Sequence, residues 1–196
     1  MKDIDRYVQI KSNNLKPDKG RLLISEPFMG DLYFGRSVVL MAEHNEEGSF
    51  GVVLNKAIDA SFNEVLEGFP DFDSKIYLGG PVDTNSTFYI HTLGDRIEDS
   101  LEIGKGLFWG GDIEMIKEMM LLKQIDPKNI RFFIGYSGWG ANQLDIELKK
   151  NSWLVHKRVN NSILNYPVEK MWSGMLNNMG SKYKYWSKFP VDPNMN

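Results

Sequence analysis

Cysteine is absent from this 196-residue chain. Its absence excludes disulfides, thiol catalysis and thiolate metal sites, and it is typical of proteins from a reducing compartment. Long apolar runs are missing too, since stretches such as 38–42 are far shorter than the ~20 residues that a membrane-spanning helix needs. Residues 1–7 mix charges of both signs and lack the apolar core of a signal peptide. We therefore expect a cytoplasmic protein that does not enter a membrane.

An excess of positive charge is also missing. Lys and Arg total 23 against 26 Asp and Glu, which gives a formal net charge of −3. Such a chain has no global field that attracts nucleic acid or an anionic membrane, so direct nucleic-acid binding is disfavoured. Basic and aromatic residues alternate in one stretch, 181–188. Lysines lying over a packed aromatic face explain this pattern better than base stacking does.

The composition that is present is that of one folded domain. Hydrophobic residues make up 42% of the chain, aromatic residues 12% and charged residues 25%, which is ordinary for a globular protein. A chain of this length buries a core without covalent staples, and no repeat or linker divides it. We predict a single domain over 1–196, with a loosely packed arm at 1–19 and a C-terminal tail at 181–196.

Strands dominate the predicted order of elements, and they come as hairpins more than as βαβ units. Capping signals predict helices that open at Ser61 and Asp112, and apolar spacing predicts further helices. This order favours the α+β class over a doubly wound fold. The predicted strands are 22–24, 37–42, 50–54, 76–78, 87–91, 130–134 and 152–156, and the further helices are 143–148, 159–164 and 168–179.

The most distinctive segment is 135–147, where three glycines precede a polar helix. We interpret its first part, including Gly138-Trp139-Gly140, as a turn between an apolar strand and that helix. Unpaired N–H groups at the start of the helix would suit a small anion. The alternative is a tight turn that lets Trp139 pack on the core.

The same segment tests the chain for nucleophilic catalysis. A nucleophile elbow needs Gly-x-Ser-x-Gly, but Trp139 occupies the last position after Ser137. Ser137, Asp145 and His156 follow the order of a hydrolase triad, yet they lie much closer together in sequence than that fold usually allows. We expect Ser137 to hydrogen-bond the local backbone instead.

Histidines are the remaining candidates for chemistry. His44, His91 and His156 lie far apart, and none has a neighbour at metal-ligand spacing. We therefore predict no metal and no cofactor. His44 and His91 both end predicted strands, so they either meet at one sheet edge or are ordinary hydrogen-bonded strand-end residues.

Five motifs follow one another along residues 20 to 180: 20–25, 36–40 with His44, 51–55, 79–82, and 135–140 with Gln143-Leu144. In this order they resemble the AlgH/YqgE family of bacterial proteins of poorly characterised function. Ala141-Asn142 departs from the Pro-Gly that the family often has, and Asp145 stands where Glu is usual.

The resemblance implies an α+β fold with a branched β-sheet and a small closed β-barrel, surrounded by helices. Some members of the family have been described as transcriptional regulators. The net charge of −3 does not support such a role through direct DNA binding.

Together these observations predict a non-enzymatic, cytoplasmic regulatory or interaction protein whose partner is another protein. No catalytic residue is assigned. The alternative is a small-molecule binder or a hydrolase-like enzyme that uses Ser137 and a histidine. The candidate binding surface consists of polar and glycine residues at strand ends: Arg36, His44, Asn55, Gly79, Gly80, Pro81, His91, Ser137, Gly138, Trp139, Gly140 and Gln143.

Overall fold

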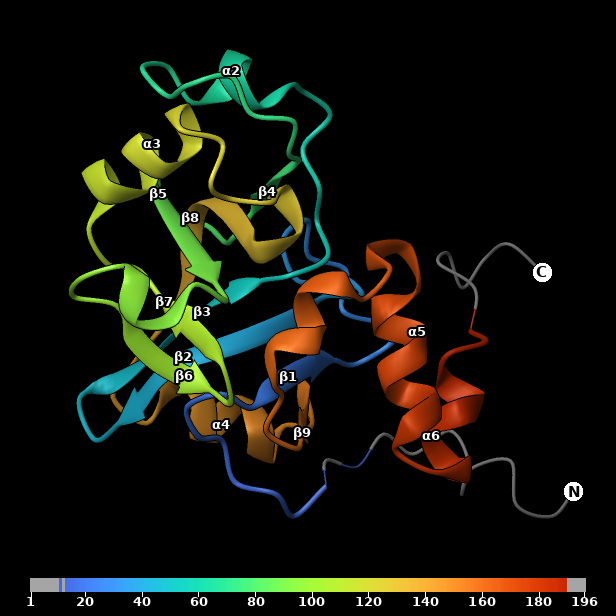
Figure 1. Ribbon diagram of the computed structural model, residues 1–196. Coiled ribbons are helices and arrows are strands. Elements are labelled where there is room, and N and C mark those ends of the chain that lie inside the picture. Colours follow the sequence, from blue (N-terminus) through green and yellow to red (C-terminus); the bar gives the residue numbers. More distant parts are fainter. Residues whose placement is uncertain (1–10, 12, 190–196) are drawn as a thin grey trace, which may run out of the picture.

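The computed structural model describes residue 11 and residues 13–189, and it shows one large sheet with helices packed around it (Figure 1). Its strand order is β6-β7-β5-β8-β3-β2-β1-β9, with β4 joined to β8. Every pairing is antiparallel except that of β4 with β8. The predicted α+β class is confirmed. The strands are β1 (Leu22–Ser25), β2 (Val38–Asn45), β3 (Gly48–Val53), β4 (Ile76–Leu78), β5 (Val82–His91), β6 (Leu101–Gly104), β7 (Leu107–Trp109), β8 (Ile130–Gly140) and β9 (Trp153–His156).

Helices cover the sheet in three places. In Figure 1, α2 and α3 lie at one end of the molecule, α4 lies near β9, and α5 and α6 lie together beside β1. Within the described residues no helix has both the length and the apolar character needed to cross a bilayer. The helices are α2 (Phe62–Val65), α3 (Ile113–Leu121), α4 (Gln143–Lys149), α5 (Val168–Asn178) and α6 (Ser181–Trp186), with 3₁₀ turns η1 (Gly94–Arg96), η2 (Pro127–Asn129) and η3 (Asn161–Asn165).

The middle of the sheet is buried on both faces, which explains why its strands are continuous apolar runs. Leu22 and Ile24 of β1 belong to the core cluster that includes α5 and α6, whereas Leu23 packs with Leu144 of α4 on the opposite face. A third cluster joins α2 and α3 to β4, β5 and the first half of β8. Each helix group therefore closes one part of the sheet.

The helix starts predicted at Ser61 and Asp112 are confirmed, whereas the helix predicted over 159–164 is the 3₁₀ turn η3. The Ser61 N–H donates to the Glu64 carboxylate at 2.7 Å, as a capping box requires. At α3, the Asp112 carboxylate accepts from the N–H groups of Glu114 and Met115 at 2.8 and 3.2 Å. Both caps satisfy backbone donors that the first helical turn leaves unpaired.

Residues 135–140 form part of a strand, so the predicted turn at this point is wrong. They complete β8, and the chain turns only at Ala141-Asn142. Gly135 has a φ of +67°, and a Cβ there would lie 2.7 Å from the Gly80 carbonyl oxygen. Glycine allows the backbone to bend here. On one side of the bend β8 pairs with β4, and on the other it pairs with β3, which gives the branched sheet.

Within the described residues, continuous strand pairing does not close the sheet into the small barrel that the family resemblance implied. The sheet path is open, with β6 and β9 at its two ends. A single parallel bridge between Lys105 and Asn160 spans these ends. Strand β9 stops at His156, so the following backbone meets the β6 side at one point and does not form a ladder.

The predicted C-terminal tail contains a helix. Trp186 of α6 is fully buried in the core cluster, and Tyr183 packs against it with ring centroids 5.0 Å apart. The Lys182 ammonium lies over both rings, 5.4 Å from the centroid of Tyr183 and 5.6 Å from that of Trp186. The alternation of lysines and aromatics in this segment therefore has a packing explanation.

Candidate functional site

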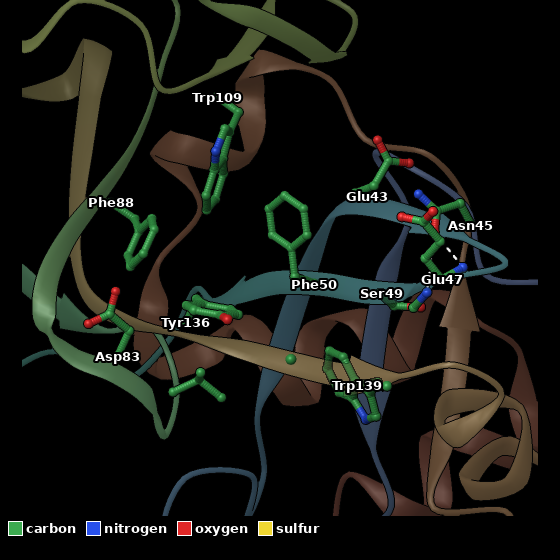
Figure 2. Close-up of a pocket in the computed structure, with 14 residues that line it drawn as sticks. Glu43, Asn45, Glu47, Ser49, Phe50, Asp83, Phe88, Trp109, Tyr136 and Trp139 are labelled. Atoms are coloured by element: carbon green, nitrogen blue, oxygen red, sulfur yellow. Dashed lines mark hydrogen bonds between the residues drawn. The ribbon is translucent and has the colours of Figure 1, made fainter.

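A groove opens beside the β2–β3 hairpin, where five strands contribute to its walls (Figure 2). Its volume is about 790 Å³. We call it the aromatic groove because its middle is lined by rings. The lining residues are Glu43, Asn45, Glu47, Gly48, Ser49, Phe50, Val82, Asp83, Phe88, Trp109, Tyr136, Gly138, Trp139 and Gly140.

Four aromatic side chains, each from a different strand, face a shared space in this groove (Figure 2). Around the circuit, the ring centroids are 5.6 Å apart for Phe50 and Trp109, and 5.8 Å apart for Trp109 and Phe88. The separations are 5.3 Å for Phe88 and Tyr136 and 6.2 Å for Tyr136 and Phe50. All four residues are partly exposed. We call this set the four-ring box.

The charges around the aromatic groove are all negative. Glu43 and Glu47 lie at the hairpin end, and Asp83 lies at the other side of the rings (Figure 2). The lining includes no Lys, Arg or His. Neither ion pair found among the described residues involves any of these three carboxylates. The groove therefore presents carboxylates and aromatic rings without a cation of its own.

Local backbone structure holds this arrangement open. The Asn45 side-chain oxygen accepts from the N–H groups of Glu47 and Gly48 at 2.9 and 3.2 Å, and so fixes the tight turn that carries Glu47. At the base of the groove, a Cβ on Gly138 would come within 3.0 Å of the Tyr136 ring. Any other residue at position 138 would crowd the four-ring box.

A second, polar groove of about 550 Å³ lies next to the same hairpin. In this groove His44 Nδ1 lies 2.7 Å from the Ser49 hydroxyl, and the two residues are directly opposite each other in the β2–β3 pairing. Asp145 and Asn142 form the wall contributed by the start of α4. Gly140 lines both grooves.

Four of the residues predicted from the sequence line these grooves: Gly138 and Trp139 in the aromatic groove, His44 in the polar one, and Gly140 in both. Trp139 is only 5% exposed, and its indole N–H donates to Glu147 at 2.9 Å. The Gly140 N–H donates to the Gln143 side chain at 3.0 Å. This N–H is therefore already paired and is not available to the anion that the sequence suggested at this corner.

Arg36 and Asn55 line neither groove. The Arg36 guanidinium lies 4.9 Å from the ring centroid of Trp172 and donates to the carbonyl of Phe189, and burial lowers its pKa. The Asn55 side chain accepts from the Val38 N–H and donates to the Arg36 carbonyl, both at 2.9 Å. Arg36 therefore joins the segment before β2 to α5 and to the residues after α6, whereas Asn55 bonds the backbone at the entry to β2.

Gly79, Gly80 and Ser137 belong to a close crossing of two backbones. The Ser137 side chain is fully buried and its hydroxyl donates to the Gly79 carbonyl at 2.9 Å. Gly80 has a φ of +155°, and a Cβ there would overlap the backbone of Tyr136. Pro81 follows on the surface. A catalytic nucleophile must be accessible to its substrate, but Ser137 is buried.

His91 is fully buried, and its contacts are not those of a metal ligand. Its Nδ1 accepts from the Leu93 N–H at 3.2 Å, so Nε2 carries the proton that is donated to the Gly110 carbonyl at 2.9 Å. The ring stacks on Phe108 with centroids 5.7 Å apart. Burial lowers the His91 pKa, while the bond to Gly110 opposes this effect. Across the described residues no three His, Asp or Glu side chains gather as metal ligands would.

Comparison with known proteins identifies the fold and the protein family. A sequence model of the family described as AlgH-like matches residues 22–184. The chain belongs to the AlgH-like family. A UPF0301 protein of Bacteroides thetaiotaomicron is 45% identical over 189 residues, which cover 96% of each chain. A UPF0301 protein of Chlorobaculum tepidum is 38% identical over 182 residues, which cover 93% of this chain and 96% of the relative.

Two solved structures resemble this AlgH-like chain. The solution structure of the AlgH protein from Pseudomonas aeruginosa matches with a TM-score of 0.69 at 28% identity, covering 91% of this chain and 98% of that one. A crystal structure of a protein from Corynebacterium diphtheriae matches with a TM-score of 0.73 at 24% identity, covering 96% and 100%. The second likeness shows the fold alone. None of these names states a biochemical activity.

Sequence reasoning missed the four-ring box of this AlgH-like chain, because its rings come from four separate strands. The hairpin register could have revealed one neighbouring contact, since a two-residue turn places His44 opposite Ser49. Phe88 and Tyr136 become neighbours only because β5 pairs with β8, and no local sequence pattern predicts that pairing.

Proposed function

We propose that this chain is a non-enzymatic, cytoplasmic interaction protein that docks a basic segment of a protein partner in the aromatic groove. One observation supports this most strongly: an open groove combines four partly exposed rings with three carboxylates and no cation. Aromatic residues are enriched in protein interfaces, and opposite charge steers and orients a partner. A regulatory effect would then operate through the partner that is held.

The shape of the groove favours an extended segment over a small metabolite. Small-molecule sites enclose most of their ligand, whereas this groove of about 790 Å³ lies open beside the hairpin. Its carboxylates lie on both sides of the rings (Figure 2). A peptide chain that crosses the rings would meet Glu43 and Glu47 with one part and Asp83 with another.

Selection of peptides from a fully randomised displayed library tests this proposal. We expect sequences rich in Arg and Lys, whose binding is lost when the groove is reversed in charge by the double substitution Glu47→Lys and Asp83→Lys. Glu67→Lys with Glu118→Lys is the matched control, because both residues are exposed, lie outside the grooves and change the net charge equally. Selected peptides without basic residues, or equal loss in both double variants, would overturn the proposal.

A second candidate function has one specific observation in its favour. The His44–Ser49 contact pairs a hydroxyl with a potential base. Ser49 is only 8% exposed but lines the polar groove, whereas Ser137 is fully buried and lines neither groove, so a hydrolase-like enzyme would use Ser49. Hydrogen-bonded polar pairs across strands are also ordinary stabilising contacts. A fluorophosphonate probe distinguishes these roles: labelling of Ser49 that is lost in His44→Ala would support the enzyme, and an unlabelled intact mass would exclude this nucleophile.

A further inference from the structure

The four-ring box leaves aromatic surface open at one place, although the same rings also contact the core. Phe88, Trp109 and Tyr136 pack against the core cluster that includes α5 and α6, while Phe50 reaches the box from the hairpin. Each ring remains partly exposed. Aromatic residues are enriched in protein interfaces, so four partly exposed rings at one place favour a binding site.

The arrangement of the rings is suited to a cation. The face of an aromatic ring carries negative electrostatic potential and attracts a cation within about 6 Å of its centroid. Neighbouring centroids in the box are 5.3 to 6.2 Å apart, and three of the four ring pairs meet edge-on, so a group seated on the circuit is near all four rings. The carboxylates of Glu43, Glu47 and Asp83 add to this attraction from outside the circuit.

The protein already pairs arginine with aromatic rings elsewhere. The Arg131 guanidinium lies 4.6 Å from the ring centroid of Tyr77, and that of Arg36 lies 4.9 Å from the centroid of Trp172. In both cases the guanidinium also donates to backbone carbonyls. A guanidinium can do both because it is planar and carries five donors around its edge.

We propose that the four-ring box binds the guanidinium group of an arginine in the docked segment. This inference rests on the proposed function, because the arginine belongs to the partner. The guanidinium would lie against the ring faces while its N–H groups point toward the carboxylates. A quaternary ammonium offers no donor to those carboxylates, and a lysine ammonium is more strongly hydrated and does not stack.

Titration with four capped pentapeptides tests the choice of cation. Their sequence is Gly-Ser-X-Ser-Gly, where X is arginine, citrulline, lysine or trimethyllysine. Binding is followed by the NMR signal of the Trp109 indole N–H, which is identified by its loss in Trp109→Phe. We expect a saturable shift with the arginine peptide, at least about tenfold weaker binding of the neutral citrulline peptide, and binding of intermediate strength for the other two.

Substitutions in the protein test the box itself. Phe88→Leu removes one ring and should weaken the arginine peptide about fivefold. Phe28→Leu is the matched control, because Phe28 is 44% exposed and stacks on Phe189 with centroids 5.3 Å apart, outside the groove. Thermal unfolding of both variants verifies that they are folded. If Phe88→Leu unfolds, Phe50→Leu replaces it, since Phe50 lies outside the core clusters.

The outcomes separate this inference from the function on which it rests. Equal or tighter binding of the lysine or trimethyllysine peptide overturns the assignment to arginine but leaves a basic docking groove. Loss of binding in Asp83→Asn without loss in Phe88→Leu overturns the ring box and again leaves the groove. If no basic peptide shifts the Trp109 signal while the library selection yields basic sequences, the segment binds elsewhere, and the inference fails.

Discussion

Glu147 offers the sharpest test of how the corner after β8 is stabilised. Its Oε2 accepts from the indole N–H groups of Trp139 and Trp153 at 2.9 and 2.7 Å, and its Oε1 accepts from Gln143 at 3.1 Å. The two tryptophans are 5% and 1% exposed. Substitution of Glu147 by alanine removes the acceptor that both buried indoles share.

The size of the effect follows from these contacts. A hydrogen bond to a charged group contributes about 1.5 to 3 kcal/mol, and a buried donor left without a partner costs a similar amount. Because Glu147 is itself partly exposed, water can replace part of what is lost. We expect Glu147→Ala to lower the free energy of unfolding by about 3 kcal/mol. Glu147→Gln keeps a neutral oxygen acceptor and should cost about 1 kcal/mol.

Urea unfolding followed by tryptophan fluorescence measures these differences. Asp145→Ala is the control on the same helix, since Asp145 is exposed and should change stability by less than about 1 kcal/mol. The explanation would be refuted if Glu147→Ala cost no more than Asp145→Ala. It would also fail if the glutamine and alanine variants were equally unstable, because the shared acceptor would then have no role.

The remaining predictions concern His91, Gly80 and Asp112. Because burial lowers the His91 pKa below its ordinary value of 6.5, the unfolded state binds the proton more readily, so stability should fall as pH drops through 6.5. His91→Gln should flatten this slope in urea titrations at several pH values, and an unchanged slope would contradict the assignment. Gly80→Ala should lower the free energy of unfolding by more than about 3 kcal/mol, because the new Cβ would overlap the backbone of Tyr136. Gly68 has a φ of +78° but lies in open space, so Gly68→Ala should cost only about 1 kcal/mol. Similar melting temperatures of the two variants would contradict this explanation. Asp112→Ala should cost about 1 kcal/mol by removing the N-cap of α3 while Asp112→Asn retains most of it, and equal losses in thermal unfolding would exclude capping.

The elements that sequence predicted well are those whose signals are local. Asp112 and the Ser61–Glu64 pair act within one helical turn, and the β2–β3 hairpin joins neighbouring segments. The β6–β7 hairpin was missed, although it is equally local. Leu101 and Glu102 are both exposed, so β6 lacks the alternation that identifies a half-buried strand.

The parts that sequence could not predict depend on contacts between distant residues. Nothing near Arg131 indicates that its guanidinium is buried and donates to the carbonyls of Leu54 and Leu164 at 3.0 and 2.7 Å. Gly135 likewise looked like part of a turn, because its role as a bend within a strand requires β3, β4 and β5 to be in place. Of the candidate site residues that reach the grooves, Gly138, Trp139 and Gly140 are placed by this strand, whereas His44 lies on β2.

Strand β8 imposes an order on the synthesis of the protein. It pairs with β3, β4 and β5, yet all three partners precede it in the chain, and β8 ends at Gly140. Domains emerge from the ribosome from the N-terminus, so these three strands must wait with unpaired edges until β8 follows. Until then, the parts of the sheet that β8 joins cannot pair with one another. A pause within residues 92–129, before β8 has been made, therefore prolongs the exposure of these edges, and an unpaired strand edge is a template for aggregation.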